Sequence, residues 1–196
     1  MPASKPQDLR NIALVGHGGA GKTTLADALL HAAGVTGRQG SVDDGSSHLD
    51  YTDIEKERKH SVDPALAHLD HGGKTINLID APGYPDFIGG AVCALGGVDT
   101  AVIVVSALSG IEVNTRRMFH LARQIGLPVA LVVSRIDGEN IDLPALTAQL
   151  TETFGSAVKP MNLPTGGGSG VIDCFSQNSG EADFGDVAEA HQELVE

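Results

Sequence analysis

Short runs of aliphatic, mostly β-branched residues recur along the chain and do not alternate with polar residues. The clearest runs are Ile12–Val15, Ala101–Val105 and Val129–Val133. Uninterrupted runs of this length are typical of strands buried on both faces of a parallel sheet. We therefore predict that these three segments are central strands.

Two further runs predict a hairpin at one edge of the sheet. Thr75–Ile79 alternates weakly, and Val62–Leu69 contains Pro64, which lacks the N–H group that a strand ladder needs. The segment Asp70–Gly73 between them is rich in turn-forming residues. We expect Val62–Leu69 to be an antiparallel edge strand.

Segments with helical spacing lie between and after these strands. The expected helices are Thr23–Ala32, Glu112–Ile125, Leu143–Phe154 and Asp186–Glu196, and a short strand is expected at Val171–Phe175. Alternating strands and helices imply a mostly parallel sheet with helices on both faces. The predicted fold class is therefore α/β, a three-layer sandwich.

Two stretches do not fit this alternation of strands and helices. Gly34–Asp50 is rich in Gly, Ser and Asp and has no period, and loops of that length inside a domain are usually functional or mobile. Pro164–Gly170 contains three successive glycines, and we expect it to be a flexible connection.

Composition narrows the functional classes. Hydrophobic residues make up 41% of the chain, but aromatic residues only 4% and there is no Trp, so we expect an aliphatic core. The net charge of −12 argues against general nucleic-acid binding through long-range attraction, and we expect no direct sequence-specific nucleic-acid binding by this chain. An anionic ligand would have to be held by local geometry.

The cysteines and the N-terminus indicate a cytoplasmic protein. Cys93 and Cys174 lie far apart and outside any Cys-x-x-Cys pattern, so we expect two small buried or half-buried residues rather than a disulfide or a zinc site. Met1–Arg10 has no apolar run, and no apolar stretch reaches the ~18 residues of a membrane span. We expect a monomer without membrane contact.

The segment Gly16–Thr23 fits the phosphate-loop pattern Gly-x-x-x-x-Gly-Lys-Thr, between a predicted strand and a predicted helix. Glycines allow backbone N–H groups to form a nest around phosphate oxygens. Lys22 then places a cation at the β- and γ-phosphates, and the Thr23 hydroxyl is suited to Mg²⁺. Such a nest allows an acidic chain to bind a nucleotide.

Two polar segments follow later strands. Asp80–Gly83 places a carboxylate that can hold Mg²⁺ through a water, and a glycine N–H that can reach a γ-phosphate. Ser134–Asp137 ends in Asp137, whose carboxylate can accept from N1–H and N2–H₂ of guanine and so discriminate against adenine. The stem of Arg135 could lie across the purine ring.

In this order and spacing, these three motifs resemble those of translational GTPases, especially bacterial elongation factor G and its paralogues. Asp50–Arg58 is similar to that family's first switch segment, and Asp80–Phe87 to its second. Gly170–Asp173 and the helix ending at Glu196 resemble the start of its inserted subdomain. The resemblance implies a P-loop fold with strand order 2-3-1-4-5, and GTP hydrolysis with Mg²⁺ that is stimulated by the ribosome.

The chain departs from the family at four places. Tyr84 stands where the family has the histidine that positions the attacking water, and Ser134 and Arg135 replace an Asn-Lys pair. Ser61 takes the place of a switch threonine, and its neighbour His60, which we expect to be solvated, replaces an apolar residue. The family's last guanine-contacting Ser-Ala pair is expected beyond Glu196.

The predicted site follows from these motifs. The residues expected to bind nucleotide are His17, Gly18, Gly19, Ala20, Gly21, Lys22, Thr23, Thr24, Asp80, Gly83, Ser134, Arg135 and Asp137. The expected Mg²⁺ ligands are Thr23, Ser61 and, through water, Asp80, and the expected catalytic residues are Tyr84, Lys22 and Gly83. We expect residues 1–158 to form the GTP-binding domain and residues 159–196 an incomplete inserted subdomain.

Two alternatives remain open. Tyr84 favours a guanine-nucleotide-binding, ribosome-associated module with little hydrolysis, and Ser134 favours an ATPase or a non-selective NTPase. The first switch region, about residues 34–60, is expected to be the most mobile part without nucleotide.

Overall fold

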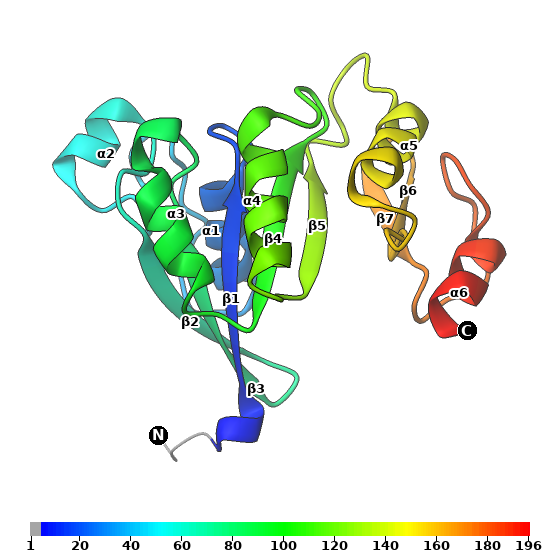
Figure 1. Cartoon of the computed structure of the whole chain (residues 1–196), viewed down its shortest axis with the longest axis horizontal. Helices are drawn as coiled ribbons and strands as arrows, with labels where there is room; N and C mark the ends of the chain where they lie inside the picture. Colours follow the sequence, from blue (N-terminus) through cyan, green and yellow to red (C-terminus); the bar gives the residue numbers. More distant parts are fainter. Residues whose placement is uncertain (1–4) are drawn as a thin grey trace. The chain divides into compact units, whose positions relative to one another are not determined.

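The computed structural model describes residues 5–196 (Figure 1). Its strands are β1 (Leu9–Gly16), β2 (Ala65–His71), β3 (Lys74–Asp80), β4 (Thr100–Ser106), β5 (Val129–Ser134), β6 (Asn162–Thr165) and β7 (Gly170–Asp173). Its α-helices are α1 (Lys22–Ala32), α2 (Asp53–Arg58), α3 (Ile88–Leu95), α4 (Val113–Gln124), α5 (Leu143–Phe154) and α6 (Val187–Val195). Short 3₁₀ turns occupy Pro6–Asp8 and Pro85–Phe87.

Five strands form one sheet in the order β2-β3-β1-β4-β5, as the resemblance implies. β1 pairs in parallel with both β3 and β4, whereas β2 pairs antiparallel with β3. The expected α/β class, with one antiparallel edge strand, is therefore confirmed. Because β1, β3 and β4 run in the same direction, the loops after their carboxyl ends gather at one edge of the sheet, where ligands of open α/β sheets bind.

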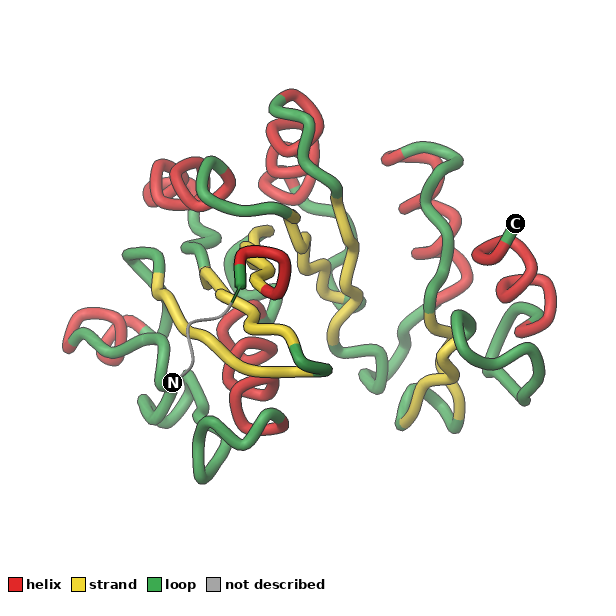
Figure 2. The backbone as a smooth tube through the Cα atoms, turned by 90° about the horizontal axis from the view of Figure 1, so that it is seen from below, coloured by secondary structure: helices red, strands yellow, loops and turns green. Residues whose placement is uncertain are grey.

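Helices cover both faces of this sheet. Figures 1 and 2 show α3 and α4 on one face and α1 on the other. Between α1 and the sheet, a buried aliphatic cluster joins Leu30 of the helix to Leu14 and Leu78 of the strands. Leu49 belongs to the same cluster, so the long loop after α1 contributes a residue to the core.

One strand differs from its predicted environment. β4 is buried over most of its length and β1 over its second half, which includes most of the apolar run Ile12–Val15. β5 is half-buried throughout and lies at the edge of the sheet, so the prediction of a central strand at Val129–Val133 was wrong. An apolar run shows that side chains prefer an apolar environment, but it carries no information about the strand's place in the order.

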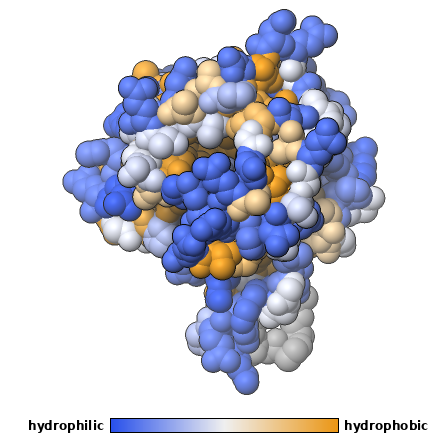
Figure 3. All heavy atoms as spheres, turned by 90° about the vertical axis from the view of Figure 1, so that its right-hand side faces the viewer, coloured by the Kyte–Doolittle hydropathy of each residue, from blue (hydrophilic) through white to orange (hydrophobic). Residues whose placement is uncertain are grey.

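The chain forms two compact units. The first runs to Val105 and includes Glu112–Val132, and the second comprises Ser106–Ile111 and Val133–Glu196. The second unit has its own buried cluster, which includes Leu163, Ile172 and Cys174. The face of the molecule drawn in Figure 3 is mostly hydrophilic, with scattered hydrophobic residues. A domain boundary at residue 158 stays a prediction.

The glycine-rich segment after residue 163 is not the flexible connection that its composition predicts. It is the turn of a β6–β7 hairpin, in which Asn162 faces Asp173 and Thr165 faces Gly170. The backbone N–H groups of Gly167 and Gly168 both donate to the carboxylate of Asp183, at 3.0 and 2.9 Å. Glycine is needed here because the turn requires positive φ at three successive residues.

Two smaller expectations can be compared with the structure. Cys174 is buried, but Cys93 is exposed, so the prediction of two buried or half-buried cysteines was wrong for Cys93; both are free. Within residues 5–196, no helix combines the length and the apolar character that a membrane span would need.

Candidate functional site

The segment between β1 and α1 has the geometry of an anion-binding nest. Gly16, Gly19 and Gly21 have φ angles of 141°, 77° and 88°, which other residues adopt only under strain. A Cβ on Gly16 would also lie 2.5 Å from the carbonyl oxygen of Val104 on the neighbouring strand. Gly21 caps α1, so the positive end of the helix dipole points into the nest.

Lys22 lies within the nest rather than in solvent. Its side chain is buried, and Nζ donates to the carbonyl oxygen of His17 at 2.8 Å. Burial lowers the pKa of the Lys22 ammonium, while the carboxylates of Asp80 and Asp50 act to raise it. Of the other predicted loop residues, Ala20 is buried and Thr24 is exposed.

Next to Lys22, four buried side chains form a cluster of oxygen atoms. The Thr23 hydroxyl donates to Asp80 Oδ2 at 2.6 Å and lies 3.1 Å from the Ser61 hydroxyl. The Ser61 hydroxyl donates to Asp50 Oδ1 at 2.7 Å. The structure thus brings the three predicted Mg²⁺ ligands together and adds Asp50, which was not among the predicted site residues.

The two carboxylates of the cluster are incompletely satisfied. Burial raises the pKa of Asp80 to about 7, against the Thr23 hydrogen bond and the Lys22 charge. Burial also raises the pKa of Asp50, against its hydrogen bond from Ser61. Asp80 Oδ1 and Asp50 Oδ2 are buried and have no hydrogen-bond partner among residues 5–196.

This cluster suits a hard divalent cation. Mg²⁺ prefers oxygen ligands, usually one or two carboxylates with waters and phosphate oxygens. The described residues contain no group of three or more His, Cys, Asp or Glu that could hold a metal ion. A cation here would therefore depend on the Thr23 and Ser61 hydroxyls and on ligands from solvent or nucleotide.

Gly83 packs directly against the nest. A Cβ on Gly83 would overlap Lys22 Nζ and lie 2.6 Å from the carbonyl oxygen of His17 and 2.7 Å from the amide nitrogen of Gly18. The Gly83 carbonyl oxygen accepts from Asn114 Nδ2 at 2.8 Å, which ties this glycine to the first turn of α4. The second switch segment (Asp80–Phe87) therefore begins in contact with the phosphate loop.

The start of α4 also holds the phosphate loop itself. Glu112 Oε2 lies 2.7 Å from His17 Nε2. Neither Glu112 nor Asn114 was predicted to belong to the site, because the sequence around them indicates only an amphipathic helix. No spacing rule relates them to a loop almost a hundred residues earlier.

Tyr84 lies over the nest, and His60 lies against Tyr84. A Cβ on Gly18 would come within 3.0–3.1 Å of three ring atoms of Tyr84. The rings of His60 and Tyr84 have centroids 4.5 Å apart, and Phe87 lies 6.0 Å from His60. The prediction of a solvated His60 was therefore wrong, because the ring is half-buried among aromatic side chains.

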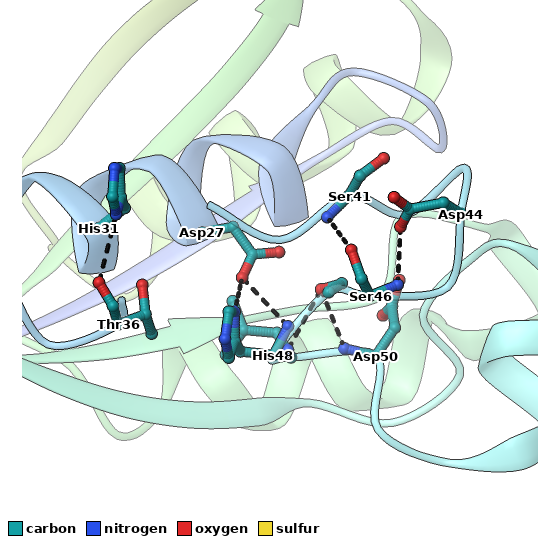
Figure 4. Close-up of polar contacts among 10 residues, drawn as sticks. Asp27, His31, Thr36, Ser41, Asp44, Ser46, His48 and Asp50 are labelled. Carbon is teal, nitrogen blue, oxygen red and sulfur yellow. Dashed lines mark hydrogen bonds and ion pairs between the residues drawn. The ribbon is translucent and has the colours of Figure 1, made fainter. Parts of the chain in front are cut away.

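The long loop after α1 is held to that helix by a buried carboxylate (Figure 4). Asp27 Oδ1 accepts from the backbone N–H of His48 at 3.1 Å and lies 2.9 Å from His48 Nδ1. Next to His48, the backbone N–H groups of Leu49 and Asp50 donate to the Ser47 hydroxyl. These contacts position the loop so that Asp50 lies in the oxygen cluster.

Glu55 in α2 holds both ends of the segment that carries Ser61. Its carboxylate accepts from the N–H and hydroxyl of Thr52 through Oε2, and from the N–H groups of Val62 and Asp63 through Oε1. Burial acts to raise the pKa of Glu55, but the hydrogen bonds from Val62, Thr52 and Asp63 outweigh it and leave the pKa below its usual value. The Thr-x-x-Glu capping-box spacing was the readable signal for this residue.

Glu55→Gln is expected to lower the free energy of unfolding of this segment by about 1–3 kcal/mol, because an amide NH₂ would face two donors. The pKa of Glu55 is lowered on folding, so its ionised form contributes stability above the unfolded pKa. This contribution is lost as the pH falls through the folded pKa, and the difference between wild type and variant should shrink on acidification. Amide exchange at Val62 and Asp63 measures the effect.

Glu57→Gln is the matched control, because Glu57 is exposed on the same helix. Equal protection of the Val62 and Asp63 amides in the Glu55→Gln and Glu57→Gln variants would show that the Glu55 carboxylate does not hold this segment.

The three predicted base-contacting residues lie at the end of β5, in the second unit. Arg135 has a φ angle of 57°, so the chain turns sharply at this point. Gly168 of the β6–β7 turn packs on the same loop, where a Cβ would overlap the Ile136 carbonyl and lie 3.0 Å from the Asp137 amide nitrogen. Ser134 accepts from the Ala107 N–H at 2.9 Å through its carbonyl oxygen.

Comparison with known proteins shows what this arrangement belongs to. Residues 7–190 match the family model described as the elongation factor Tu GTP binding domain. The chain belongs to this family. It is therefore the G-domain of a translational GTPase, as the motifs and their spacing indicate.

Individual relatives agree with this assignment. The chain is 37% identical over 175 residues to an elongation factor G-like protein of Mycobacterium tuberculosis, in a match that covers 89% of this chain and 24% of the relative. It is 34% identical over 191 residues to peptide chain release factor 3 of Streptococcus uberis, covering 92% of this chain and 37% of the relative. The chain thus spans 24% of the length of the first of these curated relatives and 37% of the second.

Solved structures show the same fold. A crystal structure of a protein from Thermus thermophilus superposes with a TM-score of 0.84 at 36% identity, over 95% of this chain and 30% of that one. A bacterial selenocysteine-specific elongation factor superposes with a TM-score of 0.58 at 25% identity, over 73% and 23% of the two chains.

Proposed function

We propose that this G-domain binds GTP and GDP with Mg²⁺ and hydrolyses GTP to GDP and phosphate as part of a translation factor. The observation that carries the proposal is the buried contact between Thr23, Ser61 and Asp80 beside Lys22. This contact supports the proposal because a side-chain cation and a set of oxygen atoms lie together beside the glycine-rich loop. A nucleotide with a bound metal ion is a ligand that uses all three features together: the glycine-rich nest, the Lys22 cation and the oxygen cluster.

Different residues of the first unit are proposed to bind the phosphates and to hold the metal ion. The nest N–H groups and Lys22 would hold the β- and γ-phosphates and stabilise the charge that develops on them. Mg²⁺ would be held by Thr23 and Ser61, with Asp80 and Asp50 acting on its bound waters, and would neutralise phosphate charge. The N–H of Gly83 is the donor proposed to face the γ-phosphate.

The reaction is a transfer of the γ-phosphoryl group to water. A bond forms between the water oxygen and the γ-phosphorus, and the bond from that phosphorus to the β–γ bridging oxygen breaks. The bridging oxygen keeps the electron pair and leaves with GDP, and the protons of the attacking water remain with the phosphate product. Tyr84 is the proposed neighbour of the attacking water.

Asp137 is proposed to select guanine, with Arg135 beside the base and Ser134 bracing the loop. The two guanine donors pair with the two carboxylate oxygens, whereas adenine has no N1–H to offer. The packing of Gly168 against this loop supports a fixed loop conformation.

Equilibrium binding with the purified chain tests the proposal. We expect GDP and GTP to bind at least about 10²-fold more tightly than ADP and ATP, because adenine leaves the Asp137 carboxylate unpaired. Omitting Mg²⁺ should weaken GTP binding. Equal affinities for guanine and adenine nucleotides would instead support a non-selective NTPase.

A second candidate function is a nucleotide-binding, ribosome-associated module with little hydrolysis, which Tyr84 favours because a phenol differs from an imidazole as a partner for water. Single-turnover GTP hydrolysis with and without ribosomes separates the two. Turnover that ribosomes stimulate supports the GTPase, and GTP that remains intact in both samples supports the binding module.

A further inference from the structure

The contact between His60 and Tyr84 joins the two switch regions. We propose that His60 is a positioning residue that holds the Tyr84 ring over the phosphate nest and so couples the two regions. The inference rests on the proposed GTP hydrolysis. His60 acts through Tyr84, and no contact between His60 and the substrate is required.

The place of His60 is fixed by its neighbour in sequence. Ser61 is buried and its hydroxyl is bound to Asp50 and Thr23, so the backbone at this point belongs to the oxygen cluster. His60 Nδ1 lies 3.3 Å from the Ser61 carbonyl oxygen. Because a carbonyl oxygen can only accept, this contact requires a proton on Nδ1, which orients the ring.

The place of Tyr84 is less strongly determined without His60. The preceding residue, Gly83, is held against Lys22 and by the Asn114 side chain. The Tyr84 side chain itself is 42% exposed, so its own burial does not select one ring orientation. Its ring lies between Gly18 of the nest and the His60 ring, and the planes of the two rings are inclined by 41°.

The two halves of the contact depend on different parts of the site. His60 is in place when Ser61 is in the oxygen cluster, and Tyr84 is in place when Gly83 is against the nest. The ring contact therefore forms only when both segments are docked. Loss of it would let the phenol rotate away from the space in front of the γ-phosphate, and displacements of about 1 Å can cost a hydrolytic enzyme about 10²-fold in rate.

The composition of the chain offers a direct reporter of the Tyr84 ring. The protein has two tyrosines and no tryptophan, and the other tyrosine, Tyr51, is 61% exposed. In a Tyr51→Phe background, tyrosine emission and tyrosine NMR signals come from Tyr84 alone. Its quenching by acrylamide can be measured with and without GDP or a non-hydrolysable GTP analogue, and requires no turnover.

We expect His60→Ala in this background to increase quenching of Tyr84 and to shift its ring signals. The same change should lower the kcat of GTP hydrolysis by about 10–100-fold with little change in KM, because nucleotide contacts are retained. His60→Phe keeps an aromatic ring without a nitrogen, and should restore both the quenching and most of the rate. His68→Ala is the matched control, since His68 lies on β2, away from the aromatic contact.

The outcomes separate this inference from the proposed function. Unaltered quenching and rate in His60→Ala would overturn the positioning role, and so would a His60→Phe variant that resembles His60→Ala in both. If wild type does not hydrolyse GTP with or without ribosomes, the proposed hydrolysis fails, whereas the quenching comparison still decides whether His60 holds Tyr84.

Discussion

Gly83→Ala is expected to lower single-turnover GTP hydrolysis by at least about 10²-fold, while GDP binding changes little. A Cβ at this position would overlap Lys22 Nζ and lie 2.6 Å from the His17 carbonyl oxygen and 2.7 Å from the Gly18 nitrogen. Two of these three atoms are backbone atoms of the nest and cannot rotate away. The chain must therefore lift Gly83 from the nest, and removing one donor from a developing charge costs about 10²–10³ in rate.

The difference between GTP and GDP gives this prediction a second readout. GDP lacks the γ-phosphate that the Gly83 N–H is proposed to face, so its affinity should be nearly unaffected. Affinity for a non-hydrolysable GTP analogue should fall toward that of GDP. This comparison remains informative even if the wild-type chain hydrolyses GTP slowly.

Gly89→Ala is the control for this variant. Gly89 lies in α3, a few residues further along the chain, and a Cβ there would meet no atom within 4 Å. An alanine inside a helix should stabilise slightly, by about 0.5–1 kcal/mol. If Gly83→Ala and Gly89→Ala hydrolyse GTP at the same rate, close packing of Gly83 on the nest has no catalytic role.

Local signals predicted most of the fold. The apolar runs located β1 and β4, and Pro64 with the turn after it placed β2 at an antiparallel edge. The edge position of β5 could not be read in this way, because its sequence resembles that of a buried strand. Sheet order depends on pairing between segments that lie far apart in sequence, and a single sequence does not contain that information directly.

The site residues likewise differ in how far the local sequence identifies them. The Gly16–Thr23 loop and Asp80 could be picked out from the sequence because their residue types and spacing fit known motifs, and the structure brings them together. Asp50 and Asn114 were not, since each joins the site through a single long-range hydrogen bond, to Ser61 and to Gly83. Glu55 lies between these cases: the capping box was readable, but not its hydrogen bonds to Val62 and Asp63.

The environment of His60 could not be predicted for a related reason. A histidine in a polar loop is ordinarily solvated, and nothing in the sequence around His60 indicates an aromatic partner. Its contact with Tyr84 accompanies the positions of Ser61 in the oxygen cluster and of Gly83 against the nest. His60 and Tyr84 both depart from the family pattern, and their contact in the structure allows the two departures to be interpreted together.

Asp137→Asn is expected to exchange the nucleotide preference of the chain from guanine to xanthine. The wild-type carboxylate offers two acceptors, which match N1–H and N2–H₂ of guanine. An asparagine would offer one acceptor and one donor, so its NH₂ would face the guanine NH₂, whereas xanthine has a carbonyl oxygen at that position. We expect GDP affinity to fall by at least about 10²-fold, or about 2.7 kcal/mol, and xanthosine diphosphate to become the preferred ligand.

The measurement is competition binding of the two diphosphates to wild type, Asp137→Asn and Glu139→Gln. Glu139 is an acidic residue two positions further on, so its variant removes the same charge from the same loop. If the effect came from charge alone, both variants would lose GDP affinity equally and neither would gain affinity for the xanthine nucleotide. Only a direct pairing between residue 137 and the base predicts that affinity for the xanthine nucleotide rises while affinity for GDP falls. If Asp137→Asn still prefers GDP, that pairing is excluded.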